Sequence, residues 1–155
     1  MITLNPIGVV RTRRLDTRDD DWGEHESVIE LRSDLPTDSL AGLEDFSHAE
    51  IVFVFDRIDE ASVATGTRHP RNNPAWPKVG IFAQRASRRP NRIGVTIVKI
   101  LGRDGPRLRV RGLDAADGTP VVDIKPVMSE FLPREPVTQP AWSHELMRGY
   151  WKSQM

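Results

Sequence analysis

Residues 85–94, RASRRPNRIG, hold four arginines, one asparagine and one proline within ten positions. A guanidinium group binds carboxylate and phosphate oxygens through paired N–H donors, so this composition suits an anion site. Pro90 restricts the backbone of the segment, and Gly94 allows close approach or unusual dihedral angles. The pattern indicates a rigid anion-binding loop, although a solvent-exposed hairpin loop that uses arginine for solubility would have the same composition.

A second polar group follows the turn sequence DGTP at residues 117–120. Val121–Ile124 reads as a short strand, and alternate side chains of a strand point to the same face, so Asp123 and Lys125 should project together. They either form a structural ion pair or frame the edge of a site.

A third group surrounds the apolar run IVFVF at residues 51–55. His48 precedes the run, and Asp56 and Arg57 follow it. A single histidine in such a place is either a structural residue or a catalytic one, whereas residues that end a buried strand often belong to sites.

Charge is unevenly distributed along a chain of zero net charge. Residues 1–60 hold 15 acidic and 6 basic residues, residues 61–103 hold 9 basic and no acidic ones, and residues 104–155 hold 7 of each. The base composition of the gene would explain the excess of arginine over lysine but not the absence of acids over 43 residues. The middle block therefore predicts a basic surface that binds nucleic acid phosphates.

Short runs of β-branched and aromatic residues, separated by turn signals, predict a mainly β fold: a small barrel of short, mostly antiparallel strands. The expected strands are 7–10, 28–31, 51–55, 79–83, 94–100, 108–113 and 121–124. Helices are expected at 40–46, for one or two turns, and at 142–151. Residues 16–26 read as an exposed acidic loop, 66–78 as irregular and 129–141 as a proline-rich connection. We expect a single domain over 1–155, with a core at about 5–128 and a C-terminal segment and helix at 129–155.

Several chemistries are excluded by residues that the sequence lacks. It has no cysteine, so disulfides, thiolate metal sites and cysteine nucleophiles are ruled out. It has no P-loop, no G-x-G-x-x-G after a strand and no G-x-S-x-G elbow. The four histidines are far apart, so no metal site is expected. No apolar run approaches the roughly 20 residues that span a bilayer, and no secretory signal is evident, which fits a cytoplasmic location.

The strings PIGVVRT, FSHAEIVFVF, RxxxRPNxIG and DGTPVVDIKP, in this order, resemble the TrmO (YaeB/TsaA-like) family over roughly residues 5–128. The resemblance implies a methyltransferase that uses S-adenosyl-L-methionine (SAM) and methylates N6 of threonylcarbamoyladenosine at position 37 of tRNA. It also implies a small β-barrel that binds SAM without a Rossmann fold, and a homodimer.

The resemblance carries a cofactor site onto this sequence, with Arg85 facing the methionine carboxylate, Asp56 or Asp114 at the ribose or amino group, and backbone near Val95 and Leu113 at the adenine. The full set of expected cofactor-binding residues is Asp56, Arg57, Arg85, Val95, Arg111, Gly112, Leu113 and Asp114. Removing a proton from the acceptor nitrogen needs a base, for which Asp123 and His48 are the candidates. The residues expected at the RNA are Arg68, Arg71, Arg88, Arg89, Asn91, Arg92 and Lys125.

The sequence departs from the family pattern at three places. The arginine-rich loop lacks the usual Ser-Pro pair, Asp56 stands where the family strand ends in histidine, and residues 16–26 replace a Pro-Arg-Gln motif. Two other functions therefore stay open: a methyltransferase of the same fold that acts on another nucleoside or a small molecule, and a SAM-binding module without catalysis.

Overall fold

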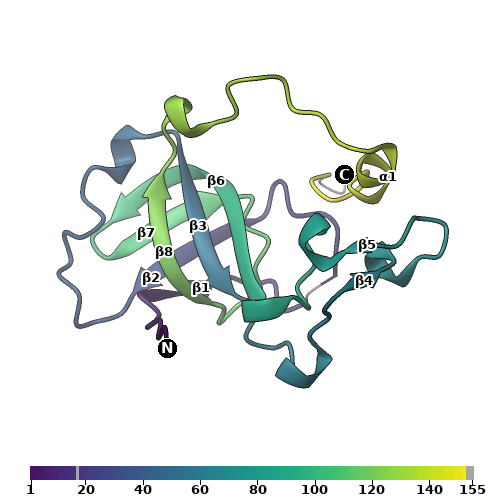
Figure 1. Cartoon of the computed structure of the whole chain (residues 1–155). Helices are drawn as coiled ribbons and strands as arrows, with labels where there is room; N and C mark the ends of the chain where they lie inside the picture. The colour runs from purple at the N-terminus through teal and green to yellow at the C-terminus, as the bar shows by residue number, and fades with distance from the viewer. Residues whose placement is uncertain (17, 153–155) are drawn as a thin grey trace.

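Six antiparallel strands close into a barrel in the computed structural model, which describes residues 1–16 and 18–152 (Figure 1). Residues 153–155, the end of the expected C-terminal segment, and residue 17 of the acidic stretch lie outside the described residues. In spatial order the strands are β1 (Gly8–Arg11), β2 (Glu26–Leu31), β7 (Arg107–Arg111), β6 (Ile93–Asp104), β3 (His48–Val54) and β8 (Pro120–Pro126). β8 pairs with β1, which closes the barrel and confirms the predicted mainly β fold.

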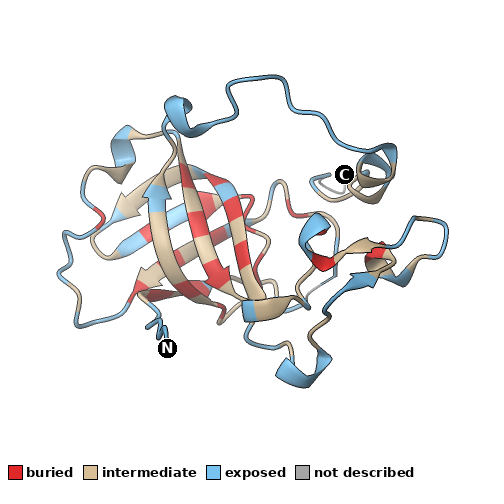
Figure 2. Ribbon diagram, viewed as in Figure 1, coloured by how far each residue is buried: buried red, intermediate tan, exposed pale blue. Residues whose placement is uncertain are grey.

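Alternating side chains fill the barrel, as the strand patterns require. In β3, every second residue is buried, and Ile51 and Phe53 are almost wholly inaccessible (Figure 2). They pack with Val10, Ile29 and Leu108 from three other strands. The β-branched composition of these runs therefore reflects an interior that is apolar on one face of each strand.

The strands exceed their predicted bounds where polar residues continue the pairing. β6 extends to Asp104, beyond the expected end at residue 100, and forms a hairpin with β7. A register shift between Ile100 and Gly102 accommodates this extension. The actual turn is confined to Gly105 and Pro106, where Gly105 has a positive φ of 56°.

Residues 58–92, between β3 and β6, form a lobe beside the barrel (Figure 1). The lobe holds a two-stranded ribbon of β4 (Thr67–Arg68) and β5 (Val79–Gly80). The prediction of irregular structure at 66–78 was therefore wrong for β4. The predicted strand 79–83 was wrong beyond Gly80, because the chain turns into a 3-10 helix there. The 3-10 helices of the described chain are η1 (Leu43–Asp45), η2 (Glu60–Ser62), η3 (Pro70–Asn72), η4 (Ile81–Ala83), η5 (Pro90–Arg92) and η6 (Ser129–Phe131).

The C-terminal helix α1 spans Ala141–Leu146 and is shorter than the predicted 142–151. After Met147 the chain turns, and the carbonyl oxygens of Gly149 and Tyr150 accept hydrogen bonds from the N–H groups of Asp21 and Trp22. These tertiary bonds attach the residues that follow the helix to the loop after β1. Residues 129–140, called the strap below, connect β8 to α1 and are exposed throughout (Figure 2).

In the part of the chain that the structure describes, none of the helices combines the length and the apolar character needed to cross a bilayer.

The barrel interior leaves no room for a side chain at Gly94. A Cβ there would lie 2.6 Å from the ring of Phe53 and 2.9 Å from the ring of Phe55. We expect Gly94→Ala to lower the free energy of unfolding by about 1–3 kcal/mol. The cost of forcing a methyl group into the packed interior exceeds the stabilisation that alanine provides by restricting the unfolded chain. Gly80→Ala is the matched control, since the nearest atom to its Cβ would be 4.0 Å away. Urea unfolding of both variants tests this, and equal stabilities would contradict it.

Candidate functional site

The strand β6 is longer than the partner that covers its outer edge. β7 ends at Arg111, opposite Lys99, so residues 93–98 of β6 pair only with β3. We call residues 93–98 the β6 edge. Gly112 ends the pairing, because its φ of 88° turns the chain away and its N–H donates to the carbonyl of His25.

Polar groups from three segments meet at the β6 edge. The guanidinium of Arg85 donates to the carbonyl oxygen of Val95 at 2.6 Å. The hydroxyl of Thr96 donates to Oδ1 of Asp114 at 2.5 Å. The phenol of Tyr150 donates to the other carboxylate oxygen, Oδ2. Three residues predicted at the cofactor, Arg85, Val95 and Asp114, are thus brought together, alongside Thr96 and Tyr150, which sequence reasoning missed.

The pKa of Tyr150 depends on both charged residues at the β6 edge, Arg85 and Asp114. Burial, followed by the neighbouring carboxylate of Asp114, raises the pKa of Tyr150, while the positive charge of Arg85 acts in the opposite direction. The phenol therefore stays protonated at physiological pH and is a hydrogen-bond donor, not a base. The phenol is thus influenced by both charged residues, with Asp114 as its direct hydrogen-bond partner.

Arg111, Gly112 and Leu113 lie where β7 ends. The guanidinium of Arg111 is 3.9 Å from the carboxylate of Glu24, and Leu113 is fully buried in the core. Gly112 and Leu113 can therefore offer a ligand mainly backbone groups.

Asp56 and Arg57 follow β3 and are both exposed. The guanidinium of Arg57 donates to the carbonyl oxygens of Leu15, at 3.2 Å, and Asp117, at 2.5 Å. These bonds make Arg57 a clamp between the end of β3, the loop after β1 and the turn before β8.

The two candidate bases lie on different parts of the barrel. Val95 of β6 pairs with Val52 of β3. His48 begins β3 four residues before Val52, so it lies about 14 Å along the strand from the position that faces Val95. Its ring accepts or donates a hydrogen bond with the hydroxyl of Ser47 at 2.7 Å. Asp123 pairs with Val52 from the other side, so it lies two strands, about 10 Å, from Val95. Asp123 is thus the nearer of the two.

Lys125 lies next to Asp123, one of the two candidate bases. Its ammonium is 2.6 Å from the carboxylate of Asp123, as expected for side chains on one face of a strand. The hydrogen bond to Asp123 raises the pKa of Lys125.

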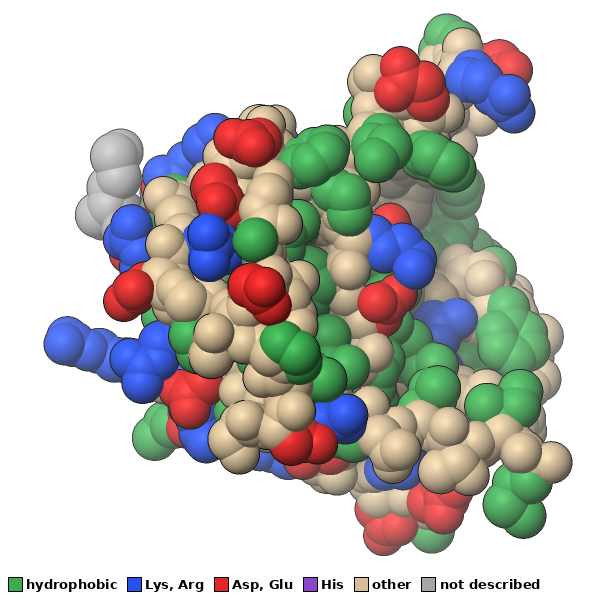
Figure 3. Space-filling model, turned by 90° about the vertical axis from the view of Figure 1, so that its left-hand side faces the viewer, with side chains coloured by type: hydrophobic (Ala, Val, Ile, Leu, Met, Phe, Trp, Pro, Cys, Tyr) green, Lys and Arg blue, Asp and Glu red, His purple; other side chains and the backbone are tan. Residues whose placement is uncertain are grey.

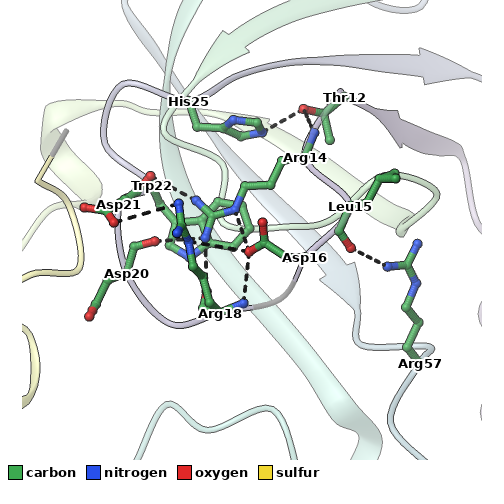
Figure 4. Close-up of polar contacts among 10 residues, drawn as sticks. All are labelled: Thr12, Arg14, Leu15, Asp16, Arg18, Asp20, Asp21, Trp22, His25 and Arg57. Carbon is green, nitrogen blue, oxygen red and sulfur yellow. Dashed lines mark hydrogen bonds and ion pairs between the residues drawn. The ribbon is translucent and has the colours of Figure 1, made fainter. Parts of the chain in front are cut away.

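The predicted acidic loop is present after β1 with Asp16, Asp19 and Glu24 exposed, but it also encloses a buried aromatic residue that its composition did not indicate. Trp22 is buried, and the guanidinium carbon of Arg14 lies 3.3 Å from the centroid of its ring (Figure 4). Arg14 also donates to the carbonyl oxygens of Arg18, Asp20 and Asp21. A desolvated cation on an aromatic face stabilises the loop, and the Asp16 carboxylate together with backbone carbonyl oxygens accepts the N–H groups of Arg14.

Several arginines of the lobe bond to backbone or to acids. Arg89 donates to the carbonyl of Gln84 and Arg92 to that of Ile58, each at 2.6 Å. Arg71 lies 3.4 Å from the carboxylate of Asp19 and 3.7 Å from that of Asp20.

The other residues expected at the RNA differ in their exposure to solvent. Arg68 is half-buried, whereas Arg88 and Asn91 are exposed. On the face of the barrel that lies away from the lobe, positive and negative side chains are intermixed (Figure 3). The exposed arginines of the lobe are therefore the better candidate for a basic surface.

Among the residues that the structure describes, no group of three or more histidine and carboxylate side chains is arranged to hold a metal ion. An apolar groove lined by Leu31, Leu40, Phe46 and Ile124, among others, contains none of the predicted site residues.

Comparison with known proteins identifies the relatives of this chain. Residues 18–131 match the family model of the tRNA-methyltransferase O N-terminal domain. A "Probable S-adenosyl-L-methionine-binding protein" of Methanothermobacter thermautotrophicus is 38% identical over 135 residues, which cover 84% of this chain and 93% of that protein. A human "tRNA (adenine(37)-N6)-methyltransferase" is 41% identical over 105 residues, which cover 68% of this chain but only 23% of that protein. A crystal structure of TrmO from Pseudomonas aeruginosa superposes with a TM-score of 0.74 at 26% identity, covering 92% of this chain and 62% of that one.

The loop around Arg14 makes stability depend on pH through His25. Burial, followed by the charge of Arg14, lowers the pKa of His25, and these effects outweigh the carboxylate of Asp16. The unfolded chain then binds more protons, so the free energy of unfolding should fall as the pH drops below about 6.5. Chemical unfolding at pH 7.5 and 5.5 measures this, and His25→Gln should show a smaller loss. The exposed His144→Gln variant should behave as wild type, and an equal loss in the two variants would contradict the assignment.

Proposed function

This chain belongs to the tRNA-methyltransferase O family, and we propose that it is a SAM-dependent methyltransferase that methylates N6 of an adenosine in tRNA. The observation that carries the proposal is the meeting of Arg85, Val95 and Asp114 at the β6 edge. The chain spans less than a quarter of the length of the human relative, so activity, substrate and partners are proposed for it and not transferred.

The residues at the β6 edge fit SAM in charge and in hydrogen-bonding capacity. The ligand carries a carboxylate, an ammonium group and ribose hydroxyls, which need a cation, an anion and hydrogen-bond partners. Arg85 has five N–H donors and uses one on Val95. The carboxylate of Asp114 accepts one hydrogen bond at each oxygen, and each oxygen retains a second lone pair.

We assign Arg85 to the methionine carboxylate and the backbone near Val95 and Leu113 to the adenine. SAM, when bound, supplies a methyl group on a positively charged sulfur. The residues that hold SAM would position this methyl group for transfer, and such positioning provides much of the rate enhancement. Asp123 is the proposed base, because it lies closer to Val95 than His48 does.

The acceptor proposal rests on the name of the human relative and on the charge of the lobe. Adenosine 37 in tRNA, in its threonylcarbamoyl form, is the substrate that the family resemblance suggests. Arg88 and Asn91 are the exposed residues best placed for RNA phosphates, because Arg71 is paired with acids. A tRNA substrate would also account for a cytoplasmic location.

We also propose that the protein is a homodimer. The strap exposes Phe131 at 86% and Val137 at 69%, and a partner would remove such side chains from water. Sedimentation at micromolar concentration would distinguish a dimer from a monomer.

Arg85→Ala should weaken SAM binding about ten- to a hundredfold, because a charge-assisted hydrogen bond typically contributes about 1.5–3 kcal/mol. Titration calorimetry with SAM measures the loss. Arg107→Ala is the control, since Arg107 lies at the far end of β7 and pairs with Glu30. Similar affinities in the two variants would show that the cofactor site lies elsewhere.

Arg88→Glu should weaken tRNA binding and flatten its dependence on salt, whose log–log slope is about −0.7 to −0.9 per neutralised phosphate. Arg88 is preferred to Arg89, because Arg89 also holds the carbonyl of Gln84. Arg134→Glu, on the exposed strap, should leave the slope unchanged. Absence of tRNA binding at low salt would favour a small molecule or another nucleoside as acceptor.

A further inference from the structure

We propose that the C-terminal residues 141–151 complete the cofactor site, and that Tyr150 positions Asp114 to bind the ammonium group of the methionine moiety of SAM. This inference rests on the proposed function and assigns one end of the ligand to named side chains. Tyr150 is here a positioning residue, because it acts through Asp114.

The segment is attached to the barrel and the lobe at separate points. Near its end, the carbonyl oxygens of Gly149 and Tyr150 accept hydrogen bonds from the backbone of residues 21 and 22, at 3.2 and 2.9 Å. At its start, the indole N–H of Trp76, in the lobe, donates to the carboxylate of Glu145 at 2.8 Å. The position of Tyr150 is therefore fixed from both sides.

The backbone of the loop after β1 permits this attachment only because residue 23 is glycine. A Cβ on Gly23 would lie 1.9 Å from the carbonyl oxygen of Trp151. Backbone atoms cannot yield as a flexible side chain can, so the close approach requires glycine. The loop that Arg14 and Trp22 hold together is thus shaped to receive the C-terminal residues.

Tyr150 and Thr96 hold the carboxylate of Asp114 from opposite oxygens. A carboxylate fixed by two hydroxyl donors is preorganised, and its remaining lone pairs are available to a third donor. The burial of Tyr150 keeps its phenol protonated, so the donor is present throughout the physiological pH range.

The positions of the charges select the amino acid end of the ligand. Arg85 bonds to the carbonyl oxygen of Val95 and Asp114 bonds to the hydroxyl of Thr96, so the two charged groups lie at adjacent residues of β6. A free amino acid group carries a carboxylate and an ammonium on a single carbon atom. A cation and an anion at short separation therefore fit that group better than they fit ribose, whose two neighbouring hydroxyls are both uncharged.

Tyr150→Phe tests the proposal with two ligands. S-adenosylhomocysteine has the amino acid moiety, and 5′-methylthioadenosine lacks it. By calorimetry we expect the variant to bind S-adenosylhomocysteine about tenfold more weakly and 5′-methylthioadenosine with unchanged affinity. Arg107→Ala, which lies outside the proposed site and pairs with Glu30, is the control and should leave both affinities unchanged.

A double-mutant cycle separates positioning from a structural effect. If Tyr150 acts through Asp114, adding Tyr150→Phe to Asp114→Asn should cause no further loss of affinity. Thermal unfolding of each variant verifies that it is folded at the temperature of the titration.

The outcomes distinguish this inference from the function on which it rests. Wild-type protein that binds neither ligand would overturn the proposed function itself. Wild-type binding with no effect of Tyr150→Phe would overturn the positioning role alone. An equal loss for both ligands would overturn the assignment of Asp114 to the ammonium group.

Discussion

The unequal lengths of β6 and β7 are the constraint on which the site depends. Twelve residues of β6 face five of β7, so closing the barrel leaves the β6 edge without a strand partner on one side. Backbone carbonyls at such an edge need donors, and the guanidinium of Arg85 supplies one at Val95. A charged side chain is thereby fixed at the stretch of β6 that lacks a strand partner on one side.

The barrel follows from the sequence because strand formation depends on local alternation. Ile51 and Phe53 point inward, and the residues between them point outward, as period-two patterning requires. The same logic correctly placed Asp123 and Lys125 on one face. Polar strand ends escaped prediction, since residues 101–104 continue β6 through pairing with β7, which is not visible in local composition.

The site was only partly predictable, because its members meet through contacts distant in sequence. The motif around Arg85 and the turn before β8 carry the resemblance to the family, and that resemblance pointed to Arg85 and Asp114. Tyr150 has no such signal, and it reaches Asp114 only because α1 ends early. Trp22 likewise lies within an acidic run, and that composition does not indicate the buried contact between Trp22 and Arg14. The acid-free block predicts a free cationic surface, but Arg71 forms ion pairs with Asp19 and Asp20, which lie outside that block.

The exposed strap connects the C-terminal residues to the barrel in the way that a linker connects a ligand to its receptor. Residues 129–140 cover none of the barrel core, so release of the tail would break local contacts and leave the packed interior intact. Docking is then an intramolecular equilibrium, in which a short tether holds the tail at an effective concentration in the millimolar range. A ligand that contacts the docked tail would favour the docked state by mass action.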